Sequence, residues 1–324
     1  MEGEIAAGSE PGPGPEPAKA APPQCEVRDA GAGKGRGLFA TREFGLGDVL
    51  FEEVPLVTGL PPLGRACAWL LAALLVGMLS LYKSGGLKEA ASMNGLWSFA
   101  TAVLGSMLLG PTIGSALEGL YVWCAVRRLS ASQRAEYFQL QSGLSRYVPV
   151  VSEFKTFRAN AVSDDGCGCL TALASLINHS CSPNACFVWD AAAGLQQVHA
   201  MRLIAKDEEI TASYVDLWGT RDARRKALMS ALGFDCACRT CLQPDDLRRL
   251  SDRRRTICAG LEAGLPAKLQ SGPAKEALGD LKRLRTTAKD EFGTEEHLVI
   301  RELDAAIADM ESEHAEAIGR AVTE

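Results

Sequence analysis

The sequence predicts an α+β fold of small sheets with a helical insertion and a helical C-terminal region. Residues 25–57 and 145–215 contain short runs of β-type residues separated by glycine and polar turns, the pattern of short strands. From about Asp246 onward the chain is charged and helical in character, with a break at Gly272-Pro273. Apolar residues recur near the end at helical spacing, at Leu298, Ile300, Leu303, Ile307 and Met310.

The composition indicates a folded, acidic protein. Of its 324 residues, 47% are hydrophobic and 23% are charged, the net charge is −6, and the mean hydropathy is +0.02. An acidic chain is poorly suited to sequence-independent binding of a phosphate backbone, so no direct nucleic-acid partner is expected. A basic segment of a substrate protein is the more favourable partner.

The cysteines indicate a reducing compartment. There are 11 of them, an odd number, and the N-terminal residues lack the apolar segment of a secretory signal. Residues 1–24 are rich in Pro, Gly and Ala and predict a disordered tail. We therefore expect a cytoplasmic or nuclear protein, in which clustered cysteines are typical of metal ligands rather than of disulfides.

Residues 61–144 are predicted to form a helical, apolar insertion. The run 66–82 carries no charge, and the run 96–126 carries only Glu118. Both lengths fit either a pair of buried helices or a transmembrane hairpin that would give membrane association. Buried helices are preferred because the runs interrupt a region with the pattern of one soluble domain.

The other boundaries follow changes in the sequence pattern. The predicted parts are two halves of a β-rich domain, a cysteine-bearing segment and C-terminal helices, at residues 25–60, 145–220, 221–245 and 246–324. Within them, Val49–Val54 predicts a strand closed by Pro55. Ser130 is the predicted N-cap of a helix that carries Tyr137 and Leu140 on its apolar face.

A metal site is predicted from Cys236, Cys238 and Cys241, which form a CxCxxC cluster. Three thiolates at this spacing can reach one zinc ion, and a tetrahedral site requires a fourth ligand, for which Cys181 is the candidate. Four thiolates leave no open position, so the expected role of zinc is structural. The alternative is a surface loop of three cysteines without a metal.

The remaining cysteines and histidines lack ligand spacing and are interpreted as packing residues. They are Cys25, Cys67, Cys124, Cys167, Cys169, Cys186, Cys258, His199, His297 and His314. The glycine-rich run Gly33–Ala40 is neither a dinucleotide-binding turn nor a P-loop, because its spacing and flanking residues differ. Alternation through Glu209–Ala212 predicts a strand ending at Tyr214, and Tyr214 and Phe234 alone would be assigned to the core.

Taken together, these blocks resemble the SET-domain protein lysine methyltransferases. The order is a GxGxG-type turn at Gly33–Gly37, the run NHSCSPN at Asn178–Asn184, then EEITASY and CxCxxC. The resemblance covers roughly residues 25–60 and 129–245 and is closest to SMYD-type and fungal SET proteins, in which an insertion divides the domain. It implies a β-clip fold in which the Tyr214 segment passes the NHSC loop in a knot-like arrangement.

The resemblance also implies roles for residues at matching positions. S-adenosylmethionine would lie against Lys34, Gly35, Arg36, Asn160, Asn178, His179, Tyr214 and Phe234, and Tyr214 would be the catalytic residue. Cys181, Cys236, Cys238 and Cys241 match the zinc ligands of the family. The implied reaction is direct methyl transfer to the lysine of a histone or another protein, without a catalytic metal.

The chain departs from this pattern in three places. Residues 60–128 contain only Cys67 and Cys124 and no histidine, so no MYND zinc module is expected. Asp207 replaces the glycine that usually opens the GEE block, which alters a turn. A second channel tyrosine has no clear match, with Tyr147 as a candidate.

The short C-terminal helices are expected to cover part of the substrate groove. The competing functional hypothesis is a SET fold that binds a peptide or cofactor without turnover.

Overall fold

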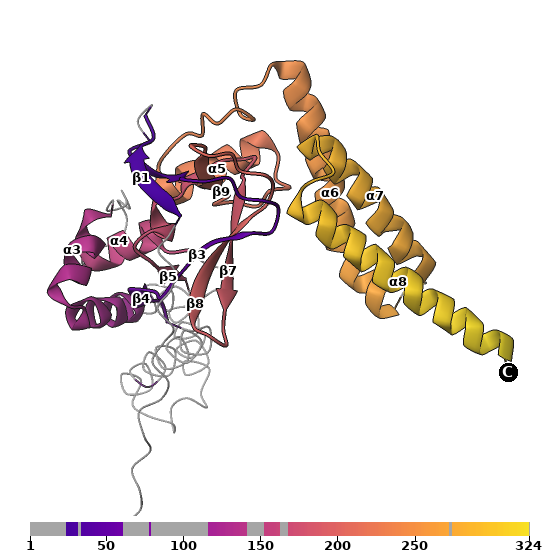
Figure 1. Cartoon of the computed structure of the whole chain (residues 1–324), viewed down its shortest axis with the longest axis horizontal. Coiled ribbons are helices and arrows are strands. Elements are labelled where there is room, and N and C mark those ends of the chain that lie inside the picture. The colour runs from indigo at the N-terminus through magenta and orange to yellow at the C-terminus, as the bar shows by residue number, and fades with distance from the viewer. Residues whose placement is uncertain are drawn as a thin grey trace, which may run out of the picture.

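The structure of the chain is a computed structural model that describes residues 24–31, 34–60, 78, 116–140, 152–162, 168–271 and 274–323. Small sheets occupy the centre, with α3 (Ala131–Gln139) and α4 (Ser152–Asn160) on one side (Figure 1). Three long helices lie on the other side, at α6 (Asp245–Ser271), α7 (Ala274–Phe292) and α8 (Leu298–Thr323). The predicted α+β class is confirmed.

The largest sheet has four strands in the order β1-β2-β9-β6. Their bounds are Cys25–Asp29, Arg36–Ala40, Glu209–Ala212 and Asn178–His179. The pairs β1–β2 and β2–β9 are antiparallel, whereas β6 and β9 are parallel. The parallel pair places His179 beside Ala212, so the NHSC run lies next to the end of the strand that leads to Tyr214.

The knot-like passage follows directly from this pairing. Beyond the pair, the Ser180 amide donates to the Ala212 carbonyl at 2.9 Å. The Tyr214 amide then donates to the ring of His179, so the chain after β9 runs against the loop that follows β6. The close passage predicted for these two segments is therefore confirmed.

Two smaller sheets complete the β region. One has the order β3-β8-β7, formed by Val49–Glu53, Leu195–Ala200 and Ala185–Asp190, and the other pairs β4 (Val57–Thr58) with β5 (Cys169–Leu170). Alternate residues of β8 face inward, and the buried side chain of Gln196 accepts from the Cys169 thiol at 2.9 Å. Cys169 is a buried core residue, as predicted, and its thiol also gives the buried Gln196 amide a hydrogen-bond partner.

Local sequence signals gave most elements their correct type. Ser130 caps α3 through a reciprocal capping box with Gln133, as its position predicted. The helix α4 is a correction, because its residues were assigned to strands and turns. Its buried Phe154 and Phe157 lie three apart on one face, and the Tyr137 hydroxyl donates to the Glu153 carbonyl at 2.5 Å. Two phenylalanines among nine residues form too weak a periodic pattern to predict this helix from the sequence.

The C-terminal region contains one more break than predicted. Besides the break between α6 and α7, the chain breaks after α7 at Gly293, whose φ of 71° is the left-handed conformation that favours glycine. The helix α8 begins at Leu298, the first of the predicted apolar positions, and the Leu298 amide donates to the Met201 carbonyl at 2.7 Å. That bond attaches the helix to the β region.

The helices α6 and α7 are attached to the β region through Arg255, which is only 1% exposed. Its guanidinium pairs with Glu291 at 2.7 Å and donates to the Cys181 carbonyl at 2.9 Å and to the Leu217 carbonyl. A buried charge is stable only when it is paired and hydrogen-bonded. Arg255 therefore fixes the helices against the loop that carries Cys181.

Several predictions lie outside the described residues. These are the disordered tail, apart from Gln24, the run 66–82, apart from Met78, and the first part of the run 96–126, together with most of the region predicted to lack a MYND module. Residues 116–126 are described and are helical. In the described part of the chain, none of the helices has both the length and the apolar character that crossing a bilayer requires.

Replacing Arg255 by Met should destabilise the fold by about 3–5 kcal/mol, because Glu291 would stay buried without its cation. The control is Arg285→Met, which removes the partner of the half-exposed Asp304 and should cost no more than about 1 kcal/mol. Urea denaturation of both variants gives the comparison. Equal losses would contradict the view that Arg255 is an attachment point.

His297 should make stability depend on pH. Burial and the nearby Arg202 lower the pKa of His297 to about 4, and its ring stacks on Phe292 with centroids 3.9 Å apart. Between the usual pKa near 6.5 and pH 4, the unfolded chain binds a proton that the folded chain does not. The free energy of unfolding should therefore decrease as the pH is lowered through this range, by up to about 3 kcal/mol. His297→Asn retains an acceptor for the Val299 amide. Urea midpoints at pH 7 and pH 4.5 should differ less in this variant.

Candidate functional site

Tyr214 is held at two points on residues 177–184, the segment with the NHSCSPN motif that we call the NHSC loop. Its amide donates to His179 Nδ1 at 3.1 Å, and its hydroxyl donates to the Ile177 carbonyl. The two rings lie with centroids 5.3 Å apart, and 41% of the Tyr214 residue surface is exposed. The side chain is thus fixed in place while part of it remains accessible to a ligand.

The hydroxyl of Tyr214 remains protonated at neutral pH. Burial of the hydroxyl, with a smaller contribution from the charge of Glu209, raises its pKa above the usual value near 10. A neutral hydroxyl donates one hydrogen bond and accepts others. Because the donor is directed at Ile177, the oxygen lone pairs of Tyr214 are the groups left to contact a ligand.

Glu209 links the glycine-rich turn to the NHSC loop. One carboxylate oxygen accepts from Lys34 Nζ at 2.8 Å, and the other accepts from Asn178 Nδ2 at 3.0 Å. A Cβ added at Gly37 would lie 2.8 Å from the Asn178 amide, so only glycine permits this approach. The sequence did not identify Glu209 or Gly37 as site residues, although both lie inside the motifs that it singled out.

The last asparagine of NHSCSPN holds the loop against β9. Asn184 is 1% exposed; its Nδ2 donates to Glu208 Oε1 at 3.0 Å and to the Glu209 carbonyl at 2.9 Å. Its Oδ1 accepts the Thr211 amide at 2.7 Å. Every polar atom of this buried amide therefore has a partner, which is a structural role that the motif signalled by position only.

The predicted cofactor residues fall into two groups. Lys34, Asn178, His179, Tyr214 and Phe234 gather around the loop, and the ring of Phe234 lies 6.2 Å from that of His179. Lys34 and His179 also line an open cavity of about 860 Å³ that extends to α6.

The second group is Gly35, Arg36 and Asn160, and the side chains of Arg36 and Asn160 form hydrogen bonds elsewhere in the chain. Gly35 has a left-handed φ of 74°, and the side chain of Arg36 donates to the Gln139 carbonyl at the end of α3, at 2.7 Å. Asn160 ends α4, and its side chain donates to the Thr156 carbonyl of the same helix at 2.8 Å. Its role at a cofactor stays a prediction.

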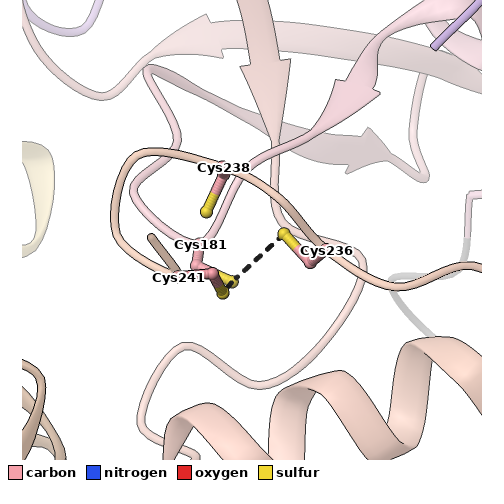
Figure 2. Close-up of side chains that lie close together, drawn as sticks. All are labelled: Cys181, Cys236, Cys238 and Cys241. Atoms are coloured by element: carbon pink, nitrogen blue, oxygen red, sulfur yellow. Dashed lines mark hydrogen bonds between the residues drawn. The ribbon is translucent and has the colours of Figure 1, made fainter. Parts of the chain in front are cut away.

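The four predicted zinc ligands converge at one point. Cys181, Cys236, Cys238 and Cys241 point toward a common centre, with Cys181 coming from the NHSC loop and the others from the loop after α5 (Arg221–Leu232) (Figure 2). Their sulfur atoms all lie within 4.8 Å of one another.

The sulfur distances fit a tetrahedral metal. Cys181 Sγ lies 3.6 Å from Cys241 Sγ and 3.9 Å from Cys236 Sγ. Zinc–sulfur bonds of about 2.3 Å in a tetrahedron separate the sulfur atoms by roughly 3.8 Å. Hydrogen bonds from the three neighbouring thiols lower the pKa of Cys181, which favours the thiolate that a metal binds.

A buried cation next to the cluster also fits a metal–thiolate centre. Arg224 is 2% exposed, and its Nε has no hydrogen-bond partner among the described residues. Burial alone would lower the pKa of Arg224, yet the sulfurs of Cys181 and Cys241 outweigh burial and raise it. Zinc with four thiolates carries a charge of −2, which gives this guanidinium an anionic neighbour.

Comparison with known proteins identifies the family. A sequence profile of the SET domain matches residues 35–215, more than half of the chain. The chain belongs to the SET-domain family. The resemblance predicted from the sequence motifs is therefore confirmed.

Curated relatives agree with this assignment. The histone-lysine N-methyltransferase set5 of Schizosaccharomyces pombe is 38% identical over 101 residues, which cover 31% of this chain and 32% of that protein. The mouse N-lysine methyltransferase SMYD2 is 29% identical over 123 residues, 38% of this chain and 25% of the relative. The matched part of the SET-domain chain thus spans about a third or less of these relatives.

Among solved structures, the SET domain of LSMT bound to lysine and AdoHcy aligns with 90% of this chain and 88% of its own. The sequence identity is 14% and the TM-score is 0.32.

Two substitutions should separate the metal site from the cofactor site. Cys181→Ser removes one of four thiolates and should lose most of the one equivalent of zinc expected in the wild-type protein. Asn178→Ala removes a side chain that does not touch the cysteines, so this variant should keep its zinc. Metal content measured by mass spectrometry checks both. Full zinc content in the Cys181 variant would remove Cys181 from the ligand set.

Proposed function

We propose that this SET-domain protein is an S-adenosylmethionine-dependent protein-lysine N-methyltransferase that acts on a lysine of a histone or of another protein. The position of Tyr214 carries the proposal. Its hydroxyl and amide are both fixed to the NHSC loop while part of the residue stays accessible. Relatives named as histone-lysine and N-lysine methyltransferases support the reaction class.

The residues around the NHSC loop would hold the methyl donor. Lys34 and Asn178 are prearranged by Glu209, and Phe234 offers an aromatic face beside His179. When bound, S-adenosylmethionine supplies an electrophilic methyl group for direct displacement by an amine. The backbone of Gly35 and Arg36 is assigned to the same cradle by the position of these residues in the family motif.

The neutral state of Tyr214 suits a lysine substrate. A lysine amine has a pKa of about 10.4 in water and must lose its proton before it can attack. A tyrosinate would stabilise the charged ammonium, whereas the raised pKa of Tyr214 keeps its oxygen neutral. Tyr214 would therefore accept a hydrogen bond from the amine and orient it, while stabilising the protonated form less than a tyrosinate would.

Zinc would be structural in this enzyme. Cys181, Cys236, Cys238 and Cys241 would occupy all four positions of a tetrahedral ion, so no position is left for a reacting group. The ion would fix the loop carrying Phe234 against the NHSC loop. The metal therefore contributes to catalysis by holding residues in place.

Tyr214→Phe should lower kcat about 100-fold, the effect of a misplaced substrate amine, while cofactor binding measured by calorimetry stays nearly unchanged. The assay is transfer of labelled methyl groups from S-adenosylmethionine to histones or to cell-extract proteins. The control is Tyr121→Phe, because Tyr121 is 40% exposed on the helix at residues 116–128 and should not affect transfer.

Two outcomes would reject the proposal. Undiminished transfer by Tyr214→Phe would remove the residue on which it depends. Cofactor binding by the wild-type protein without transfer to any substrate would favour a binding module. Mass-spectrometric identification of methylated lysines in the extract would then name the substrate of an active enzyme.

A further inference from the structure

His179 contacts both halves of the candidate site through its ring. Its Nδ1 accepts the Tyr214 amide at 3.1 Å, and its Nε2 lies 3.3 Å from Cys181 Sγ. The residue is only 8% exposed, and both ring nitrogens face protein atoms. A histidine assigned only to the cofactor would not need both nitrogens engaged by the protein.

These contacts determine which nitrogen carries the proton. A backbone amide can only donate, so Nδ1 must be unprotonated to accept from Tyr214. A neutral imidazole then carries its hydrogen on Nε2. That hydrogen faces Cys181 Sγ, and an N–H donor stabilises a thiolate more than a neutral thiol.

We propose that His179 is a positioning residue that couples the metal-loaded cysteine cluster to the main chain of Tyr214. With zinc bound, the Cys181 thiolate holds the Nε2–H of His179, and the ring orientation that results keeps Nδ1 against the Tyr214 amide. The effect on catalysis rests on the proposed methyltransferase function, whereas the coupling itself does not.

The geometry explains why the two contacts depend on each other. Rotation of the imidazole by half a turn exchanges Nδ1 with a carbon atom, which would leave the Tyr214 amide facing a C–H group. The contact with Cys181 opposes that rotation. Partners that orient a ligand commonly change metal affinity by about 10–100-fold when removed, so the dependence should be measurable from the metal side as well.

Two substitutions separate the two hydrogen bonds. His179→Asn places an amide oxygen near the position of Nδ1, so it retains an acceptor for Tyr214 and loses the donor to Cys181. His179→Gln places an amide nitrogen near the position of Nε2, so it retains the donor and loses the acceptor. The control pair is His199→Asn and His199→Gln, because His199 bonds to Gln197 in β8, away from both groups.

Zinc release into a chromogenic chelator is the first measurement. His179→Asn should release zinc about tenfold faster than the wild-type protein. His179→Gln and both His199 variants should release it within about threefold of the wild-type rate. Equal rates for His179→Asn and His179→Gln would overturn the proposal.

Hydrogen exchange of the Tyr214 amide, followed by NMR, is the second measurement. His179→Gln should exchange this amide roughly tenfold faster, whereas His179→Asn should keep it protected. Stripping zinc from the wild-type protein should also speed exchange, and in His179→Asn it should not. Amides of the β7–β8 pair report any global unfolding.

These measurements do not require methyl transfer. If the wild-type protein transfers no methyl group but the exchange pattern holds, the proposed function fails and the coupling stands. If zinc removal leaves the Tyr214 amide of the wild-type protein equally protected, the coupling fails whatever the activity.

Discussion

The NHSC loop is held by contacts from segments far apart in the chain, and the site depends on them. β9 contributes Glu209 and the Tyr214 segment that follows it, the loop after α5 contributes three cysteines, and α6 contributes Arg255. These contacts fix Ile177, Asn178, His179 and Cys181, and Cys181 is held both by the other cysteines and by Arg255. Because no single element forms the site, its geometry exists only when the whole β region and the helices are assembled.

The charges around this loop follow from burial rather than from the overall charge. The chain has a net charge of −6, yet two guanidiniums, Arg224 and Arg255, are buried against the loop and the cysteine cluster. Arg255 is neutralised by Glu291, whereas Arg224 lies beside the sulfur atoms of Cys181 and Cys241, which raise its pKa. A buried cation costs several kcal/mol unless it is paired, so the position of Arg224 is consistent with a charged metal centre.

The sequence predicted the parts of the site whose chemistry depends on spacing. Cys236, Cys238 and Cys241 lie within residues 236–241, and their spacing alone indicated a metal site. Arg255 was not foreseen, because its partners are 36 and 74 residues away and nothing local marks a buried arginine. Asp207, which stands where the family has glycine, adopts the left-handed φ of 67° that usually favours glycine, and it pairs with Arg28 at 2.5 Å.

The loop at residues 234–243 shows how metal and cofactor sites are connected. It contains neither helix nor strand, so ordering its ten residues costs roughly 10–20 kcal/mol of conformational free energy. A structural zinc ion contributes about 10–16 kcal/mol, which is of the same order as that cost. Hydrogen bonds from the loop to the rest of the fold offset part of the remaining conformational cost; one is donated by Arg221 to the Cys241 carbonyl at 2.9 Å. Phe234 begins this loop, so a metal bound by the cysteines would also hold Phe234 beside His179. Under the proposed function, binding of the metal and binding of the cofactor would then be thermodynamically linked.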